Sequence, residues 1–441
     1  MRKHYIAIDI GASGGRHVAG WLEDKKLRTR EIYRFEHAPK VKDGRQIWDT
    51  AAMFEHILEG LTRCKREGIL PVSVGIDTWG VDYALLDKND ELIGDVICYR
   101  DDRTQTVISQ VHSIISEADL FKRTGIATQS FNTLFQLYAD KLEGRLERAK
   151  SILLVADYFS FLLTGIRSNE YTLASTSGLV NAESRTWDKN IITKLNFPQK
   201  LFTRPISVPG TILGQLKDSI QKRIGYNTQV VLPPAHDTAS AVLAVPAKDP
   251  LYISSGTWSL LGVNEDKPKT DEESRRLGYT NEGGYDGKYR FLKNIMGLWL
   301  IQCLRREFNN KYTFESMEKM AMEADPVKVP YIDVNDKRFF NPSSMINAIK
   351  SYLAETNQVS FKSDGELFLC VYNSLARAYA STAKEVERLT GKKYDTINIV
   401  GGGSKNTLLN QLTAKHSGKK VVVGPVEATA EGNLIAQIRA G

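Results

Sequence analysis

The residues best suited to chemistry form a short run near the N-terminus, Asp9-Ile10-Gly11-Ala12-Ser13-Gly14-Gly15-Arg16. Its glycines allow positive φ and a close approach by another group, and Ala12 and Ser13 are small enough not to block it. Backbone N–H groups in such a turn can face an anion, and Asp9 can hold a metal ion beside it. The run matches neither G-x-G-x-x-G nor G-x-x-x-x-G-K-[ST], which disfavours the two common nucleotide motifs. An ordinary strand and glycine hairpin is the alternative interpretation.

A second candidate is Asp237, in the run Pro233-Pro-Ala-His-Asp-Thr-Ala-Ser-Ala241. The prolines end a strand predicted at residues 230–232, and the small residues after Asp237 begin a helix. At this junction the carboxylate can act as a general base or as a helix N-cap. The residues alone leave both roles open. His236 beside it is either a site residue or a satisfied core histidine.

Three further runs have compositions that suit ligands. Residues 77–82 read Asp-Thr-Trp-Gly-Val-Asp and combine hydrogen-bonding groups with an aromatic ring, as a sugar site needs. Ser255-Gly-Thr257 is a small-residue turn between two strand-like runs. Gly401-Gly402-Gly403 follows a strand predicted at residues 396–400 and opens a helix, which lets a nucleoside approach closely.

The elements that position these runs repeat along the chain. Strands are predicted at residues 5–10, 16–21 and 27–37, a helix capped by Asp49 to about residue 66, and a strand at 72–76. After residues 247–250 the order returns, with strands at 251–254, 258–263 and 289–293 and a helix from about 296. A long helix at 364–389, a strand at 396–400, a helix from about 407, a strand at 420–423 and a helix from 427 follow. The plan predicts an α/β protein of two similar halves.

Composition narrows the function classes. The chain has 441 residues, 42% hydrophobic and 25% charged, which is ordinary for a globular protein of two or three domains. The net charge of +7 is scattered, so no nucleic-acid partner is implied. No apolar run reaches the ~18 residues of a membrane span, and Asp9 interrupts any signal peptide. The four cysteines form no ligand cluster, which favours reduced thiols in the cytoplasm.

The repeated plan resembles the duplicated ribonuclease-H-like fold of the actin, hexokinase and heat-shock-chaperone ATPases, in which two domains flank a cleft. The motifs resemble those of the FGGY carbohydrate kinases along nearly the whole chain. The matching stretches are residues 9–16, 75–82, 99–104, 131–136, 156–160, 236–240, 254–259, 400–404 and 424–428, with Asn294 and Gln302. The resemblance divides the chain into an N-terminal domain at residues 1–246 and a C-terminal domain at 247–441. The N-terminal domain would bind the sugar and carry the phosphate turn and the catalytic aspartate. The C-terminal domain would bind the nucleotide.

The resemblance also implies roles for individual residues. It makes Asp237 the general base and gives Asp9 a magnesium ion, held through water. It places the sugar on Gly80, His236, Asp237, Thr238 and Asn294. It places ATP on Ala12, Ser13, Gly14, Gly15, Arg16, Thr257, Gln302, Gly401 and Gly402. The roles of Trp79, Arg100, Asp101 and Arg103 stay open between the sugar site and structural packing.

The implied activity is phosphorylation of the primary hydroxyl of a ketose by ATP with Mg²⁺. The runs at residues 78–82 and 131–136 favour L-rhamnulose, phosphorylated at O1 in L-rhamnose catabolism. L-Fuculose and xylulose are the alternatives within the same class. A non-catalytic sugar sensor of the same fold is disfavoured, because such a protein usually carries an added DNA-binding or effector module. A chaperone or filament ATPase is disfavoured, because it would lack a sugar pocket. We expect a cytoplasmic monomer or small homo-oligomer that binds a ketose and ATP.

Overall fold

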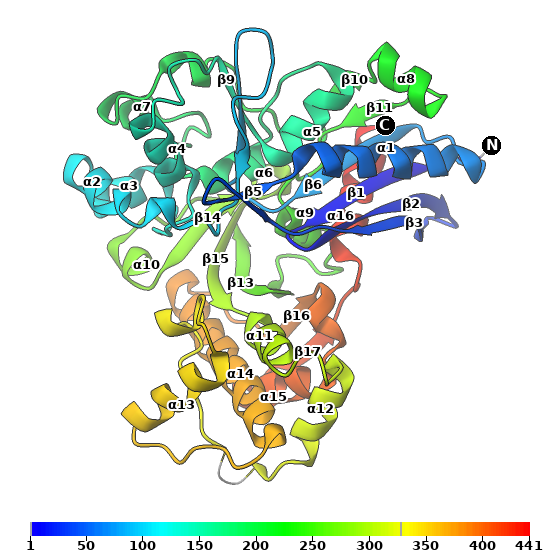
Figure 1. Ribbon diagram of the computed structural model, residues 1–441. Coiled ribbons are helices and arrows are strands. Elements are labelled where there is room, and N and C mark those ends of the chain that lie inside the picture. The colour runs from blue at the N-terminus through cyan, green and yellow to red at the C-terminus, as the bar shows by residue number, and fades with distance from the viewer. Residues whose placement is uncertain (1, 327–328) are drawn as a thin grey trace. The chain divides into compact units, whose positions relative to one another are not determined.

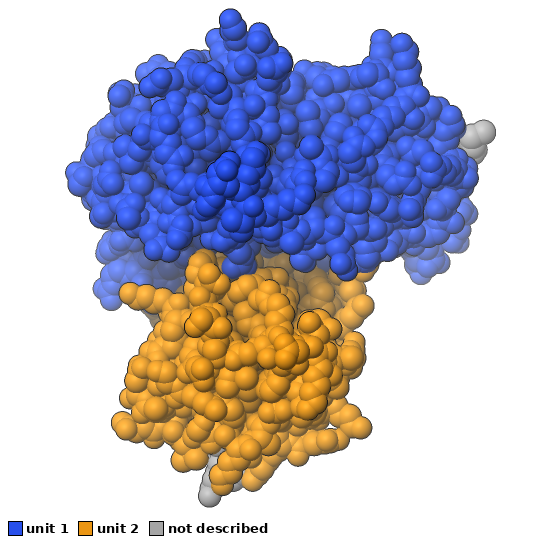
Figure 2. All heavy atoms as spheres, viewed as in Figure 1, with its two compact units in different colours: residues 1–244, 265–291, 428–441 blue, residues 245–264, 292–427 orange. Residues whose placement is uncertain are grey.

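The computed structural model describes residues 2–326 and 329–441 and contains two compact units (Figures 1 and 2). Unit 1 comprises residues 1–244, 265–291 and 428–441, and unit 2 comprises residues 245–264 and 292–427. The predicted division at 246/247 is close to the first crossing between the units. Further along the chain the predicted division differs from the two units, because residues 265–291 and 428–441 pack in unit 1. Sequence order alone does not reveal such returns of the chain.

Unit 1 is organised around a six-stranded sheet with the order β10-β11-β6-β1-β2-β3. Its strands are β1 (Tyr5–Gly11), β2 (Gly14–Glu23), β3 (Lys26–Glu36), β6 (Ser73–Thr78), β10 (Ile212–Gln215) and β11 (Gln229–Val231). The central strand β1 is antiparallel to β2 and parallel to β6. The β2–β3 hairpin closes through Asp24 and Lys25, both with positive φ, as a type I′ turn requires. The predicted strands of this half are therefore present.

The two faces of β1 are buried against different partners. Ile6, Ile8 and Ile10 belong to the large apolar core, which includes Ile57 of helix α1 (Thr50–Arg66). Tyr5 and Ala7 pack with residues of helix α16 (Ala428–Ala440). Figure 1 shows α1 and α16 on opposite sides of this strand. Since successive side chains alternate between faces, Asp9 lies on the same face as Tyr5 and Ala7, toward α16 and helix α9 (Asp237–Leu243).

Helix α16 is attached to this sheet through buried amides as well as apolar contacts. Gln437 donates to the carbonyl of Ile6 at 2.9 Å, and its side-chain oxygen accepts from the Ser73 hydroxyl at 2.7 Å. Asn433 donates to the carbonyl of Gly75 at 3.1 Å. Both side chains are almost fully buried. Because each buried polar atom named here has a partner, this interface specifies one register of helix on sheet.

The other helices and strands of unit 1 surround this core. The strands outside the main sheet are β4 (Lys40–Lys42), β5 (Arg45–Trp48), β7 (Tyr83–Leu86), β8 (Val96–Ile97) and β9 (Ser151–Leu154). The helices are α2 (Val107–Ile114), α3 (Glu117–Thr124), α4 (Thr133–Leu142), α5 (Val155–Thr164), α6 (Tyr171–Ala174), α7 (Lys189–Lys194), α8 (Asp218–Ile224) and α10 (Glu272–Arg276). The short β4–β5 hairpin was not predicted, because its exposed strand β4 has no buried periodic pattern.

Unit 2 repeats the plan of unit 1. Its elements are β12 (Leu251–Ser255), β13 (Trp258–Glu265), β15 (Tyr289–Met296), β16 (Thr396–Val400), β17 (Lys420–Val423), α11 (Trp299–Glu307), α12 (Phe314–Glu323), α13 (Met345–Glu355), α14 (Asp364–Thr390) and α15 (Thr407–Ser417). The sheet order is β14-β15-β13-β12-β16-β17, with β14 (Tyr279–Gly283) and the first residues of β15 grouped in unit 1. As in unit 1, the central strand β12 is antiparallel to the next strand and parallel to β16. This duplicated α/β architecture confirms the predicted fold class.

No helix among residues 2–326 and 329–441 is long and apolar enough to cross a membrane.

The packing of α16 on α9 generates a stability prediction. A Cβ atom at Gly432 would lie 1.7 Å from the Ser240 carbonyl oxygen, so the two helices meet only because this residue has no side chain. We expect Gly432→Ala to lower the free energy of unfolding by about 1–3 kcal/mol. Urea unfolding followed by circular dichroism measures this. Thr429→Ala, on the same helix and half-buried, is the matched control, and equal stability of both variants would contradict the packing argument.

A second prediction concerns pH. Glu170 is fully buried and accepts from the Ala235 N–H at 3.1 Å and from the backbone N–H groups that begin α6. Burial raises the pKa of Glu170 to about 7 from its ordinary 4.5, despite these hydrogen bonds. The folded state then holds a proton that the unfolded state has released, so this group's stabilisation is complete below pH 4.5 and declines as pH rises toward 7.

Glu170→Gln should therefore flatten the fall in stability between about pH 5 and pH 8. Urea unfolding at several pH values measures the slope, with the exposed Glu91→Gln as control. An unchanged slope in Glu170→Gln would show that this carboxyl group titrates alike in both states.

Candidate functional site

The run at residues 9–16 forms the hairpin between β1 and β2. Gly11 and Gly14 are the last paired residues, so Ala12 and Ser13 alone make the loop. A Cβ at Gly14 would lie 2.7 Å from the Phe35 carbonyl oxygen, and one at Gly15 would lie 2.4 Å from the Phe35 ring. Neither glycine has a positive φ. These two glycines are therefore required by the close approach of β3, rather than by an unusual backbone conformation.

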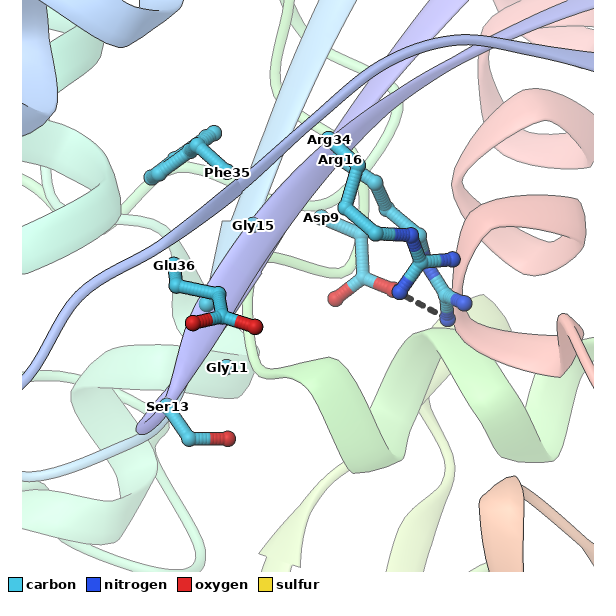
Figure 3. A pocket seen from close by; sticks show the side chains of 9 residues that line it. Asp9, Gly11, Ser13, Gly15, Arg16, Arg34, Phe35 and Glu36 are labelled. Atoms are coloured by element: carbon cyan, nitrogen blue, oxygen red, sulfur yellow. Dashed lines mark hydrogen bonds and ion pairs between the residues drawn. The ribbon is translucent and has the colours of Figure 1, made fainter.

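A pocket of about 320 Å³ opens beside this hairpin. Its lining residues are Asp9, Gly11, Ser13, Gly14, Gly15, Arg16, Arg34, Phe35 and Glu36. Figure 3 shows Ser13 at the tip of the hairpin and the side chains of Arg16 and Arg34 close together beside Asp9. Four residues predicted for ATP, Ser13 to Arg16, line this one pocket. Arg34, Phe35 and Glu36 come from β3 and were not predicted.

Asp9 and Arg16 form an ion pair at the floor of this region. Arg16 donates from Nε at 2.9 Å and from Nη2 at 2.7 Å, both to Oδ2 of Asp9 (Figure 3). The two residues are opposite each other in the β1–β2 register. Because both donors reach the same oxygen, the guanidinium is held at one edge of the carboxylate. The pair places a positive charge next to the hairpin loop, where an anion would bind.

A second buried carboxylate, Asp77, lies next to Asp9. The two occupy paired positions of the parallel strands β1 and β6. Oδ2 of Asp77 accepts from Asn433 of α16 at 2.6 Å, whereas Oδ1 is buried without a hydrogen-bond partner. Burial, together with the negative charges of Asp9 and Asp237, raises the pKa of Asp77 well above its ordinary value. The ends of these two neighbouring strands therefore crowd two carboxyl groups together, and the crowding favours the neutral form of Asp77.

Asp237 is the first residue of α9, and His236 is the N-cap residue. The carboxylate does not cap the helix in the usual way, because Oδ1 accepts from the adjacent Thr238, from N–H at 2.5 Å and from the hydroxyl at 3.1 Å. Burial and the charge of Asp9 raise the pKa of Asp237, while His236 and the Thr238 hydrogen bonds oppose the shift. The N-cap interpretation is thus not supported, and the carboxylate is positioned by its own neighbour.

The imidazole of His236 is held by two residues from β14 and β15. Nη2 of Arg290 lies 2.9 Å from Nδ1 of His236 and 2.9 Å from Oε2 of Glu282. Arg290 has no exposed surface. Nδ1 of His236 also lies 3.3 Å from Oε2 of Glu282, and Nε2 lies 3.5 Å from Oδ1 of Asp237. Because a guanidinium only donates, the contact with Arg290 favours the tautomer in which Nδ1 accepts and Nε2 faces the candidate base.

Glu282 remains ionised in this cluster. Burial alone would favour the neutral acid, but the charge of Arg290, 2.9 Å away, outweighs it and lowers the pKa of Glu282. An ionised glutamate compensates the buried Arg290 charge, which would otherwise be costly. Sequence reasoning missed both residues, because neither lies in a motif. Only the return of residues 265–291 to unit 1 brings them to His236.

The end of β6 lies beside this loop. Thr78 N–H donates to the Ala235 carbonyl at 2.9 Å, and Thr78 and His236 form a parallel bridge. The predicted sugar residues Gly80, His236, Asp237 and Thr238 therefore belong to neighbouring segments of one unit. Asn294 lies on β15 in unit 2, and its assignment to the sugar stays a prediction.

The residues whose roles were open all make structural contacts. Trp79 is buried and donates to Asp82 at 2.9 Å. Asp101 accepts from the Gln46 N–H at 2.8 Å, and Arg103 is paired with the buried Asp140. Arg100 lies over the Tyr99 ring, 5.1 Å from its centroid. These contacts favour packing and ion-pair networks over direct ligand binding.

The carboxylates fit magnesium only partly by themselves. Within residues 2–326 and 329–441, no group of three or more His, Cys, Asp or Glu side chains is arranged to hold a metal ion. Mg²⁺ keeps several waters and is commonly bound by one or two carboxylates together with substrate phosphates. Asp9, with the unpartnered Oδ1 of Asp77 on the adjacent strand, fits this water-mediated mode. The predicted magnesium role of Asp9 is compatible with this geometry and stays a prediction.

Unit 2 contains four of the nine residues predicted for ATP, namely Thr257, Gln302, Gly401 and Gly402. The carbonyls of Gly256 and Thr257 accept from the N–H groups of Leu298 and Trp299 at 2.9 and 3.1 Å, where the helix carrying Gln302 begins. A Cβ at Gly401 would lie 2.8 Å from the Ser255 carbonyl oxygen, whereas one at Gly402 would meet nothing within 4 Å. The glycine run thus packs against the Ser255–Thr257 turn. Gly402 leaves open space where a ligand can approach.

Comparisons with known proteins extend this picture. The sequence model of the "FGGY family of carbohydrate kinases, N-terminal domain" matches residues 4–244, and the C-terminal domain model matches residues 251–441. The rhamnulokinase of Halalkalibacterium halodurans is 45% identical over 98% of this chain and 92% of its own length. That of Oceanobacillus iheyensis is 44% identical over 100% of this chain and 94% of its own length.

Solved structures give the same result for the fold. The crystal structure of gluconate kinase from Lactobacillus acidophilus aligns with a TM-score of 0.82 at 17% identity, covering 100% of this chain and 89% of that one. Two family models that together span nearly the whole sequence, curated relatives above 40% identity and the duplicated fold agree. This chain belongs to the FGGY family of carbohydrate kinases.

Proposed function

We propose that this protein transfers the γ-phosphoryl group of ATP to the 1-hydroxyl of L-rhamnulose, giving L-rhamnulose 1-phosphate and ADP. The observation that carries the proposal is the arrangement of Asp237, held by Thr238, with Nε2 of His236 3.5 Å from its Oδ1. The curated relatives at 44–45% identity, which are rhamnulokinases, support the choice of sugar. The solved gluconate kinase is too distant in sequence, at 17% identity, to support any particular sugar.

Asp237 would accept the proton of the attacking hydroxyl as the oxygen bonds to the γ-phosphorus. A raised pKa makes this carboxylate a stronger base than an exposed aspartate, while His236 and Thr238 favour its ionised form. His236 would donate from Nε2 to a sugar oxygen, because Arg290 occupies Nδ1. These two residues would orient the sugar for an in-line transfer, which depends mainly on positioning.

The phosphates of ATP would lie against the β1–β2 hairpin of unit 1. Arg16 is the cation of the hairpin, and its ion pair with Asp9 holds it at the pocket. Ala12, Ser13, Gly14 and Gly15 would contribute backbone donors, and Thr257, Gln302, Gly401 and Gly402 would contact the nucleotide. When bound near Asp9 through water, Mg²⁺ would neutralise phosphate charge. The monomeric or small oligomeric state and the cytoplasmic location stay predictions.

The reaction is tested by coupled ADP release with Mg-ATP on L-rhamnulose, L-fuculose and D-xylulose, with a blank that contains no sugar. A rate well above the blank on L-rhamnulose alone is the expected result. Equal rates on all sugars would retain a kinase and reject the narrow substrate. A rate that does not respond to sugar, or no rate, would reject the sugar kinase and favour a sensor or another ATPase of this fold.

Asp237→Asn tests the general base. The substitution keeps the size of the side chain and the acceptor for Thr238 but removes the proton acceptor, so we expect kcat to fall by roughly 10²–10⁴-fold. Sugar binding, measured by calorimetry, should persist. The matched control is Asp218→Asn, at the first residue of α8, which should keep full activity. Full activity of Asp237→Asn would exclude Asp237 as the base.

A further inference from the structure

The backbone directly after Gly80 has an unusual conformation. Val81 has φ of +69°, in the left-handed region that β-branched residues almost never occupy. The N–H of Asp82 donates to the Gly80 carbonyl at 2.9 Å, which closes a three-residue turn around Val81. Val81 is 8% exposed, so neighbouring residues rather than solvent surround this strained backbone. Such a conformation persists only where the surroundings enforce it, and it is often found at functional sites.

Two threonine hydroxyls enforce it. Thr176, in the short helix η2 (Ser175–Ser177) after α6, accepts from the Val81 N–H at 3.2 Å and donates to the Leu173 carbonyl at 2.8 Å. Thr133, the first residue of α4, donates to the Val81 carbonyl at 2.6 Å. Both threonines are buried. The N–H and the carbonyl of the strained residue are therefore each held by a hydroxyl from a different helix.

Asp82, the residue after Val81, holds the C-terminal end of the turn. The carboxylate of Asp82 accepts from Trp48 at 2.7 Å, Trp79 at 2.9 Å, Gln136 at 3.0 Å and the Tyr99 N–H at 3.1 Å. Asp82 is 1% exposed. With four donors on this one carboxylate, the segment that follows Val81 has no freedom to absorb a change in the turn.

The same helix touches the glycine that was assigned to the sugar. A Cβ at Gly80 would lie 3.0 Å from the Thr176 hydroxyl and 3.2 Å from its methyl group. Two residues before Gly80, Thr78 is joined to Ala235, at the loop that carries His236. A change of the Val81 turn would therefore move the Gly80 backbone relative to that loop. Thr176 is thus placed to control the shape of the sugar site without reaching the reacting atoms.

We propose that Thr176 is a positioning residue: with Thr133, it holds Val81 in its left-handed conformation and thereby fixes the Gly80 backbone as one wall of the ketose site. This inference rests on the proposed function, in which Gly80 lines the ketose. Backbone strain at Val81 would then contribute to sugar selectivity. The sequence around Thr133 and Thr176 gives no sign of this strain. The role predicts a loss of sugar binding with little change in the chemical step.

The test is Thr176→Val, which keeps the shape of the side chain and removes the hydroxyl. We expect KM for L-rhamnulose to rise by about tenfold, with kcat and KM for ATP within about threefold of the wild-type values. Calorimetric titration with the ketose should weaken in parallel. Thr176→Ser, which retains the hydroxyl, should restore sugar KM to within about threefold of wild type.

Val81→Gly separates strain from packing, because glycine adopts positive φ at no steric cost. In the Val81→Gly background, Thr176→Val should raise sugar KM by less than about threefold, since the hydroxyl is no longer needed to enforce the turn. An equal rise in both backgrounds would overturn the proposal. So would an unchanged sugar KM in Thr176→Val. If Thr176→Val does not fold, Thr133→Val tests the same clamp with the same expected outcome.

Thr124→Val is the matched control. Thr124 is equally buried at 4%, donates to the Leu120 carbonyl at 2.8 Å and accepts from the Ile126 N–H at 3.2 Å, but it does not touch the turn. It should lose stability as Thr176→Val does and keep the wild-type sugar KM. A rise in KM in Thr124→Val would show that lost stability alone explains the effect. If the wild-type protein phosphorylates no ketose, the proposed function fails, and ketose titration of the same variants still decides this inference.

Discussion

The crowding of carboxylates at the ends of β1 and β6 is the constraint on which the rest of unit 1 depends. Asp9 and Asp77 are buried register neighbours, and burial together with the charges of Asp9 and Asp237 raises the pKa of Asp77. Such crowding is unfavourable unless positive charge or hydrogen-bond donors compensate it. Arg16 compensates Asp9, and Asn433 of α16 donates to Asp77. Arg16 and Asn433 together leave part of the negative charge of the carboxylates uncompensated. This remaining negative charge suits the proposed site, in which the phosphates would bind together with a cation.

Local patterns predicted the positions of this chemistry, and distant packing determined its surroundings. The hairpin at residues 9–16, the junction at Asp237 and the strand order could be predicted because each depends on residues close in sequence. Glu282 and Arg290 could not, since they reach His236 only through a return of the chain to unit 1. Glu170 and Thr176 belong to a segment without periodicity, and their importance comes from the backbone groups that they hold. The hairpin glycines were predicted to allow a positive φ, whereas Gly14 and Gly15 have no positive φ and are instead explained by the close approach of Phe35.

The second unit uses the same strand plan with different chemistry. Asp9 lies two residues before the last residue of β1, whereas β12 ends with Ser254 and Ser255. Both strands lead into a turn of small residues, and both pair with one antiparallel and one parallel neighbour. Replacing the acid by serine gives a turn that approaches an anion without repelling it. One backbone plan thus carries an acidic turn in unit 1 and a neutral turn in unit 2.

The buried amides of α16 also govern when unit 1 can be completed during synthesis. Asn433 and Gln437 supply hydrogen bonds to Gly75, Ile6 and Ser73, more than 350 residues earlier in the chain. Until they leave the ribosome, one face of the central strand lacks its cover, and Asp77 lacks its amide donor. A nascent chain that already carries every other element of the acidic site is therefore still unfinished. This face of the sheet is therefore covered only after α16, which lies more than 350 residues beyond Ile6, Ser73 and Gly75, has been synthesised.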